Sequence, residues 1–150
     1  MQFPGSWDVD EPGLIEVAQC FALSILDNYE QNNQHSLMVH LKGELGAGKT
    51  TFVRGLLTQL GVSAAVKSPT YTLVETYSTN IGRIAHYDLY RVADPGELEF
   101  IGFRESISES TLTLIEWPEH AAAVLGAANW SISIAYIDAG RRLQVSGEFP

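Results

Sequence analysis

An eight-residue segment, 43–50, reads GELGAGKT and matches the phosphate-binding pattern G-x-x-x-x-G-K-[ST] in full. Glycines in such a loop let the backbone curl so that its N–H groups point at phosphate oxygens, a geometry that larger side chains would block. In this pattern Lys49 places its ammonium against the β- and γ-phosphates, and the hydroxyl of Thr50 binds Mg²⁺. The segment therefore predicts that the chain binds a nucleoside triphosphate.

The sequence on either side of this loop has the character that the pattern requires. Residues 36–41 form a short apolar run of strand length, and apolar residues recur at helical spacing from Phe52 to Leu60, where Gly61 ends the helix. A loop between a strand and a helix lies at the positive end of the helix dipole, which favours bound phosphate. These neighbours predict a strand–loop–helix unit.

The remaining pattern predicts an α/β fold, a mixed sheet of the P-loop NTPase type flanked by helices, with antiparallel hairpins added to it. At 150 residues we expect a single domain over 1–150. We expect a helix over 12–28, a loop over 30–36, a hairpin of strands 71–77 and 83–89, a short helix from an Asp94 N-cap to Gly102, a strand over 112–116, a helical piece over 118–125 and a closing hairpin of strands 130–137 and 142–145.

Composition excludes several classes of function. The net charge is −9 with only nine Lys and Arg, so we expect no strong direct binding to nucleic acid, which depends on clustered cations. Cys20 is the only cysteine, which rules out an intrachain disulfide and a cysteine-based metal site. Because the chain has neither a run of about 20 apolar residues nor a signal peptide, we expect a cytoplasmic protein that does not associate with membranes.

A phosphate loop needs an acid that holds Mg²⁺ or orients a water molecule, and such acids lie at the ends of neighbouring buried strands. Glu116 ends the apolar run 112–115, and Asp88 ends the second strand of the first hairpin. We expect both at the nucleotide, although a carboxylate at a strand end is often only a loop cap. His86 shares a strand face with Asp88, so it is either hydrogen-bonded to that acid or a structural histidine.

Two further segments each allow two interpretations. Residues 68–71 follow the phosphate-loop helix, where a segment that senses the γ-phosphate is found in several P-loop nucleotidases, but they also form an ordinary turn before a strand. Trp117 either lies against the nucleotide or covers the core. His35, His40 and His120 have no metal-ligand spacing.

Four motifs in a fixed order resemble one family. They are GELGAGKTTF at 43–52, SPTYTLVE at 68–75, HYDLYR at 86–91 and IEWPE at 115–119. Together they resemble the TsaE (YjeE) family, the bacterial P-loop ATPases of tRNA threonylcarbamoyladenosine synthesis, over about residues 10–145. The resemblance implies hydrolysis of ATP with Mg²⁺ and a complex with the TsaD and TsaB proteins, which modify the adenosine beside the anticodon.

The same resemblance implies roles for individual residues. It places the loop on the phosphates, Thr50 and Glu116 on Mg²⁺, and Asp88 as a second acid needed for hydrolysis. It also places Trp117 and Arg141 near the nucleotide and Glu11 near the base. The resulting set is catalytic Lys49, Asp88 and Glu116; nucleotide-binding Glu11, Gly46, Ala47, Gly48, Lys49, Thr50, Thr51, Trp117 and Arg141; and metal-binding Thr50 and Glu116.

The leading hypothesis is an ATPase that hydrolyses ATP slowly alone and faster with its partners. Arginine fingers contribute about 10³–10⁵ to the rate in this chemistry, and the chain offers few candidates, of which Arg141 is the best. A GTPase is disfavoured because the sequence N-K-x-D is absent, and a small-molecule kinase because no Arg-rich lid is evident. A partner-binding module gated by nucleotide, with incidental hydrolysis, stays open because it needs the same residues.

Overall fold

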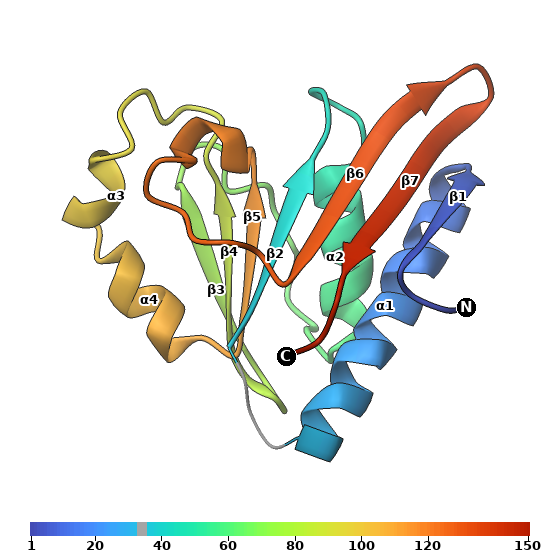
Figure 1. The fold of residues 1–150 in the computed structure, drawn as a ribbon, viewed down its shortest axis with the longest axis horizontal. Coiled ribbons are helices and arrows are strands. Elements are labelled where there is room, and N and C mark those ends of the chain that lie inside the picture. Colours follow the sequence, from blue (N-terminus) through green and yellow to red (C-terminus); the bar gives the residue numbers. More distant parts are fainter. Residues whose placement is uncertain (33–35) are drawn as a thin grey trace.

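The computed structural model describes residues 1–32 and 36–150 and is organised around one mixed sheet of seven strands (Figure 1). The strands follow one another across the sheet in the order β1-β7-β6-β2-β5-β4-β3. Strands β6, β2, β5 and β4 are parallel, whereas β1, β7 and β3 are antiparallel additions at the two edges. The strands are β1 Gly5–Val9, β2 Leu37–Lys42, β3 Val74–Thr79, β4 Gly82–Asp88, β5 Leu112–Glu116, β6 Trp130–Ile137 and β7 Gly140–Gly147. The expected mixed sheet with hairpin additions is confirmed.

Helices cover the two faces of this sheet, α1 and α2 on one face and the pair α3 and α4 on the other (Figure 1). The helices are α1 Glu11–Asn32, α2 Lys49–Gln59, α3 Glu97–Phe100, α4 Phe103–Glu109 and the 3₁₀ helix Pro118–Ala121. The apolar face expected for the first helix is the one that α1 buries, at Leu14, Val17, Ala18, Phe21, Ala22 and Ile25. Asp10 starts this helix, because its carboxylate accepts the N–H of Gly13 at 2.9 Å.

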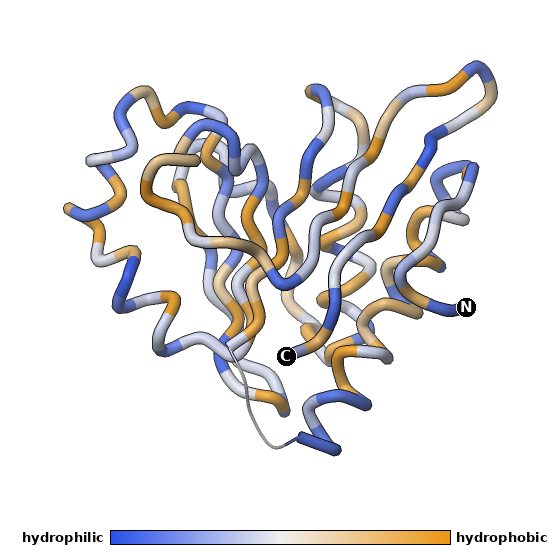
Figure 2. Tube along the Cα trace, viewed as in Figure 1, coloured by the Kyte–Doolittle hydropathy of each residue, from blue (hydrophilic) through white to orange (hydrophobic). Residues whose placement is uncertain are grey.

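Strands β4 and β5 bury side chains on both faces, which is typical of central parallel strands. Ile84, Leu112 and Leu114 join the core beneath α1 and α2, whereas Tyr87 and Ile115 join a second core with α3 and α4. Figure 2 shows hydrophobic residues along the central strands and hydrophilic residues at the last turn of α1.

The structure corrects several expected element boundaries. The strand expected from Tyr71 begins at Val74, because Leu73 has a positive φ of 70° and its N–H donates to the carbonyl of Pro69 in a turn. Asp94 makes the expected capping bonds, since its carboxylate accepts the N–H of Gly96 at 2.9 Å and its own N–H donates to Oε1 of Glu97 at 3.3 Å, but the regular helix starts only at Glu97. The first helix runs four residues beyond the expected end, while positions 33–35 of the expected loop lie outside the described residues.

Two elements, β1 and α4, are not evident from the sequence. Strand β1 pairs with β7 from Gly5↔Val145 to Val9↔Arg141, so it depends on a partner far along the chain. Gly102 adopts a left-handed conformation with φ of 70° and ends the α3 segment, after which α4 continues. No helix in 1–32 or 36–150 combines the length and the apolar character that crossing a membrane requires.

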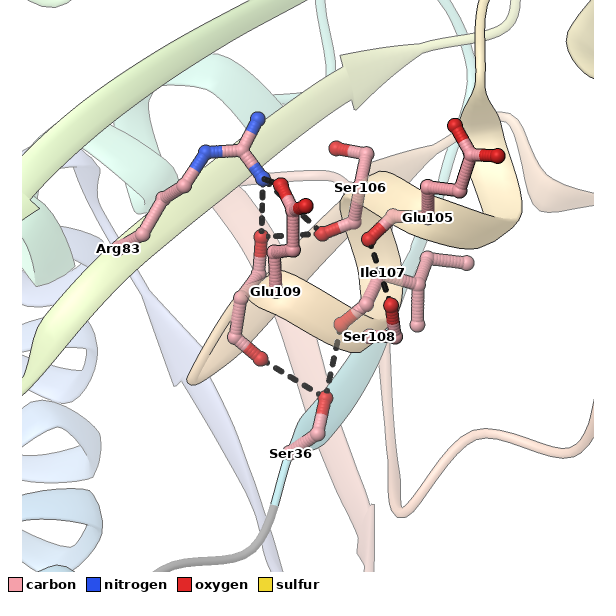
Figure 3. A network of polar contacts seen from close by, with 8 residues as sticks. Ser36, Arg83, Glu105, Ser106, Ile107, Ser108 and Glu109 are labelled. Atoms are coloured by element: carbon pink, nitrogen blue, oxygen red, sulfur yellow. Dashed lines mark hydrogen bonds and ion pairs between the residues drawn. The ribbon is translucent and has the colours of Figure 1, made fainter.

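A polar network holds α4 against the end of the sheet opposite the phosphate loop (Figure 3). The Arg83 guanidinium on β4 donates from Nη1 to the carbonyl of Ser106 at 3.0 Å and to the hydroxyl of Ser110 at 3.1 Å. The hydroxyl of Ser36, just before β2, donates to the carbonyl of Ser110 at 2.9 Å. These side chains satisfy carbonyls at the end of α4 that lack a partner within the helix.

Replacing Arg83 by methionine should lower the free energy of unfolding by about 1 kcal/mol, since it removes two charge-assisted hydrogen bonds from a partly buried site. Arg104→Met is the matched control, because that guanidinium only approaches Glu99 at 3.4 Å on an exposed surface and should change stability little. Denaturant unfolding of both variants measures the difference. Equal losses would contradict the role of Arg83 in holding α4.

Candidate active site

The phosphate loop connects β2 to α2, and its glycines occupy backbone conformations that other residues rarely adopt. Gly46 has φ of 77° and Gly48 has φ of 119°. A Cβ atom on Gly48 would lie 2.7 Å from Cδ2 of Leu14, and one on Gly46 would lie 3.0 Å from the hydroxyl oxygen of Tyr136. The glycines are therefore required by the left-handed backbone and by close neighbours as well as by the phosphate that the pattern predicts.

Lys49 begins α2, and its side chain turns back over the loop. Its Nζ donates to the carbonyls of Gly43 at 2.6 Å and Glu44 at 3.0 Å, and it lies 4.3 Å from the centre of the Trp117 ring. Burial lowers the pKa of the Lys49 ammonium, an effect that the nearby carboxylates of Glu116 and Asp88 oppose. The structure thus holds a buried ammonium between the loop and two acids.

Glu116 and Asp88 lie side by side because β5 and β4 are parallel and the register pairs Asp88 with Glu116. Glu116 is only 2% exposed. Its Oε1 accepts a hydrogen bond from the Thr50 hydroxyl at 3.0 Å and lies 2.8 Å from Nε2 of His86. The possible His86–Asp88 pair is therefore wrong: the hydrogen-bonding partner of His86 is Glu116, on the neighbouring strand.

Asp88 is held by the segment that follows α2. The Thr70 hydroxyl donates to Oδ2 of Asp88 at 2.8 Å, and the Ser68 hydroxyl lies 3.3 Å from the same oxygen. The backbone N–H of Tyr90 donates to Oδ1 at 2.9 Å. Residues 68–70 are therefore joined directly to an acid at the end of the sheet.

These residues surround one cleft of about 170 Å³ at the carboxyl end of the parallel strands. Open α/β sheets bind their ligands at this end. Of the residues expected at the nucleotide, those that line the cleft are Gly46, Gly48, Lys49, Thr50, Thr51, Asp88, Glu116 and Trp117. Leu45, Ser68 and Thr70 line it as well.

Ala47, Arg141 and Glu11 lie outside this lining. The Ala47 side chain is buried beneath the loop, and its carbonyl accepts a hydrogen bond from Nε of Arg141 at 2.9 Å. The guanidinium of Arg141 also lies 4.1 Å from the centre of the Tyr136 ring, whose hydroxyl donates to the carbonyl of Leu45 at 3.2 Å. The β6–β7 hairpin thus contacts the phosphate loop through Tyr136 and Arg141. Glu11 is exposed at the first turn of α1.

The residues of the cleft fit a magnesium–phosphate group. Mg²⁺ prefers oxygen ligands and is bound in proteins through a few carboxylate or hydroxyl oxygens together with phosphate oxygens. Thr50 and Glu116 present such oxygens next to the glycine-rich loop, and Lys49 supplies a positive charge. ATP and Mg²⁺ are therefore chemically compatible with the cleft.

Comparison with known proteins identifies the family to which the chain belongs. The family model for the threonylcarbamoyl adenosine biosynthesis protein TsaE matches residues 16–143. The chain belongs to the TsaE family. The tRNA threonylcarbamoyladenosine biosynthesis protein TsaE of Haemophilus influenzae is 42% identical over 136 residues, which cover 91% of this chain and 84% of that protein.

Other members of the TsaE family and one solved structure are also similar. The protein of the same name from Aquifex aeolicus is 46% identical over 86 residues, which cover 56% of this chain and 59% of that protein. The crystal structure of Bacillus subtilis YdiB superimposes with a TM-score of 0.73, covering 97% of this chain and 86% of that one, at 24% identity. That likeness confirms the fold.

In this TsaE-family chain, sequence reasoning missed how two residues are used. The site residues predicted from the sequence include neither His86 nor Tyr136, although the first bonds to Glu116 and the second to the loop. The spacing of His86 and Asp88 predicts that both lie on one face of the strand. It therefore indicates Asp88 as the partner of His86, whereas the partner in the structure is Glu116. His120 is not among the residues that line the cleft, and its Nδ1 bonds to the carbonyl of Leu89 at 2.9 Å. His40 is half-buried on β2, and His35 lies outside the described residues.

Proposed function

We propose that this chain binds ATP with Mg²⁺ in the cleft and hydrolyses it as a component of tRNA threonylcarbamoyladenosine biosynthesis in the cytoplasm. The observation that carries the proposal is the hydrogen bond between Thr50 of the phosphate loop and Glu116 at the end of β5, 3.0 Å long. It joins the residue that the P-loop pattern predicts as a metal ligand to one of the two strand-end acids expected at the nucleotide, the one that the family resemblance implies as a metal ligand. Membership of the TsaE family supports the assignment to tRNA threonylcarbamoyladenosine biosynthesis.

Each residue has a role in this proposal. The loop N–H groups and Lys49 bind the phosphates and stabilise the charge that develops during transfer. Mg²⁺, when bound, neutralises charge on the phosphate oxygens. Thr50 and Glu116 would hold it, and Asp88, fixed by Thr70, orients the attacking water.

Partner proteins have two tasks in this proposal. With a net charge of −9, the chain needs another protein to hold the tRNA, and we propose TsaD and TsaB for that role. The second task is to supply a group for rapid hydrolysis. Arg141 is engaged with the carbonyl of Ala47 and with Tyr136, and Arg91 lies 4.2 Å from the centre of the Tyr71 ring. Slow hydrolysis by the chain alone follows from this engagement.

The test is ATP turnover with Mg²⁺, measured for the chain alone and then with purified TsaD and TsaB. We expect partners to raise the rate at least about tenfold, because an arginine supplied in trans can contribute about 10³–10⁵. Equal rates with and without the partners would contradict the coupling. Failure to bind ATP at all would contradict the proposal as a whole.

A second candidate function is a partner-binding module that ATP gates and in which hydrolysis is incidental. The direct bonds from Ser68 and Thr70 to Asp88 favour it, since a change at the acid would move a partly exposed segment. Asp88→Ala and Glu116→Ala should both abolish hydrolysis. Asp88→Ala should keep its affinity for ATP, whereas Glu116→Ala loses a proposed metal ligand and is compared at saturating ATP. Full tRNA modification by these variants in a single round would favour gating, and loss of modification would favour energy coupling.

A further inference from the structure

His86 is a fully buried histidine that the proposed chemistry does not yet use. It lies on the central strand β4 with 0% of its surface exposed. Its Nε2 is 2.8 Å from Oε1 of Glu116, and its Nδ1 has no hydrogen-bonding partner among the described residues. Because Glu116 accepts as a carboxylate, Nε2 carries the proton and donates.

This burial is costly for a residue with a purely structural role. Moving an imidazole from water into the interior with one ring nitrogen unpaired costs free energy. A branched apolar side chain would fill the same space without that penalty. Ile84, two residues earlier and on the same face of β4, belongs to the apolar core beneath α1 and α2. The single polar contact of His86 is therefore the feature that distinguishes it from a core residue.

The contact restricts the Glu116 carboxylate. Oε1 accepts from both His86 and Thr50, two donors on different elements, so the carboxylate cannot rotate freely about its last bond. Oε2 is left for a partner in the cleft that Glu116 lines. Replacing a group that holds a metal ligand in place typically lowers metal affinity or activity by about 10- to 100-fold.

We propose that His86 is a positioning residue, which holds Glu116 in the orientation that the Mg²⁺–nucleotide complex requires. The proposal rests on the proposed function and deepens it. His86 itself touches neither nucleotide nor metal; it acts through Glu116. Asp88 takes no part in this arrangement, since Thr70 and Tyr90 hold it separately.

The test measures affinity for a non-hydrolysable ATP analogue by calorimetry, with Mg²⁺ and with EDTA. His86→Leu removes the donor at similar volume, and His86→Gln returns an N–H at about the position of Nε2. We expect His86→Leu to reduce the gain in affinity from Mg²⁺ by about 10-fold, without changing affinity in EDTA, and His86→Gln to restore most of it. Thr113→Val is the matched control, because Thr113 on β5 is also 0% exposed and its hydroxyl has no partner among the described residues.

Three results would overturn the proposal. A full gain from Mg²⁺ in His86→Leu excludes positioning, and equal losses in the Leu and Gln variants would indicate a packing role. An analogue that fails to bind to the unmodified chain would overturn the proposed function together with this inference, and so differs from either of the first two. If thermal melting shows that His86→Leu is unfolded, His86→Asn, whose shorter amide does not reach Oε1, replaces it as the loss variant.

Discussion

Lys49→Ala is expected to lower ATP turnover at least about 100-fold, because it removes a fixed positive charge from the transferring phosphate. In the structure this ammonium is buried and held by the carbonyls of Gly43 and Glu44, with Glu116 and Asp88 close by. A preorganised charge of this kind stabilises the transition state more than the ground state. Steady-state turnover with saturating ATP and Mg²⁺ measures the effect.

Lys42→Ala is the control for a simple loss of charge. Lys42 ends the strand that leads into the loop, but its side chain is exposed and lines a different hollow, beside His40 and Glu119. We expect it to leave turnover within about twofold of the unmodified chain, as for a screened surface charge. Near-normal turnover in Lys49→Ala, with an unchanged melting temperature, would contradict the assigned role.

Phe21→Ala is expected to cost about 3–5 kcal/mol of the free energy of unfolding, by loss of apolar burial and by the cavity left behind. Phe21 on α1 is 0% exposed. Its ring lies 5.2 Å from Phe3, 6.3 Å from Phe52 and 5.3 Å from Trp130, measured between ring centres, so it joins α1 to α2, to β6 and to the N-terminal segment. Denaturant unfolding, and a melting temperature lowered by roughly 2–4 °C per kcal/mol, measure the loss.

The same substitution on the surface separates burial from the chemistry of phenylalanine. Phe100 at the end of α3 is 93% exposed, so Phe100→Ala should change the free energy of unfolding by less than about 0.5 kcal/mol. Losses of similar size in the two variants would show that Phe21 does not have the place in the core that the structure assigns to it.

The parts of the fold that sequence predicted well are governed by neighbours along the chain. The buried face of α1 follows from apolar residues at helical spacing, and β5 occupies residues 112–116 as expected because a short apolar run that Trp117-Pro118 interrupts has the length of a buried strand. The extent of the turn after Pro69 is not predicted from the sequence. The positive φ of Leu73 and the hydroxyl bonds of Ser68 and Thr70 to Asp88 delay the start of β3 in a segment rich in strand-forming residues.

The site residues that belong to the phosphate loop are likewise close together along the chain. Lys49, Thr50 and the glycines could be recognised from sequence because one loop contains them all, and its function depends on their spacing. The contacts of His86 with Glu116, and of Arg141 and Tyr136 with the loop, bring together residues from different strands. By itself, the sequence determined the phosphate loop and the acids at the strand ends. Only the tertiary structure decided which side chains support them, because strand order and register, and hence these distances, depend on how the whole sheet packs.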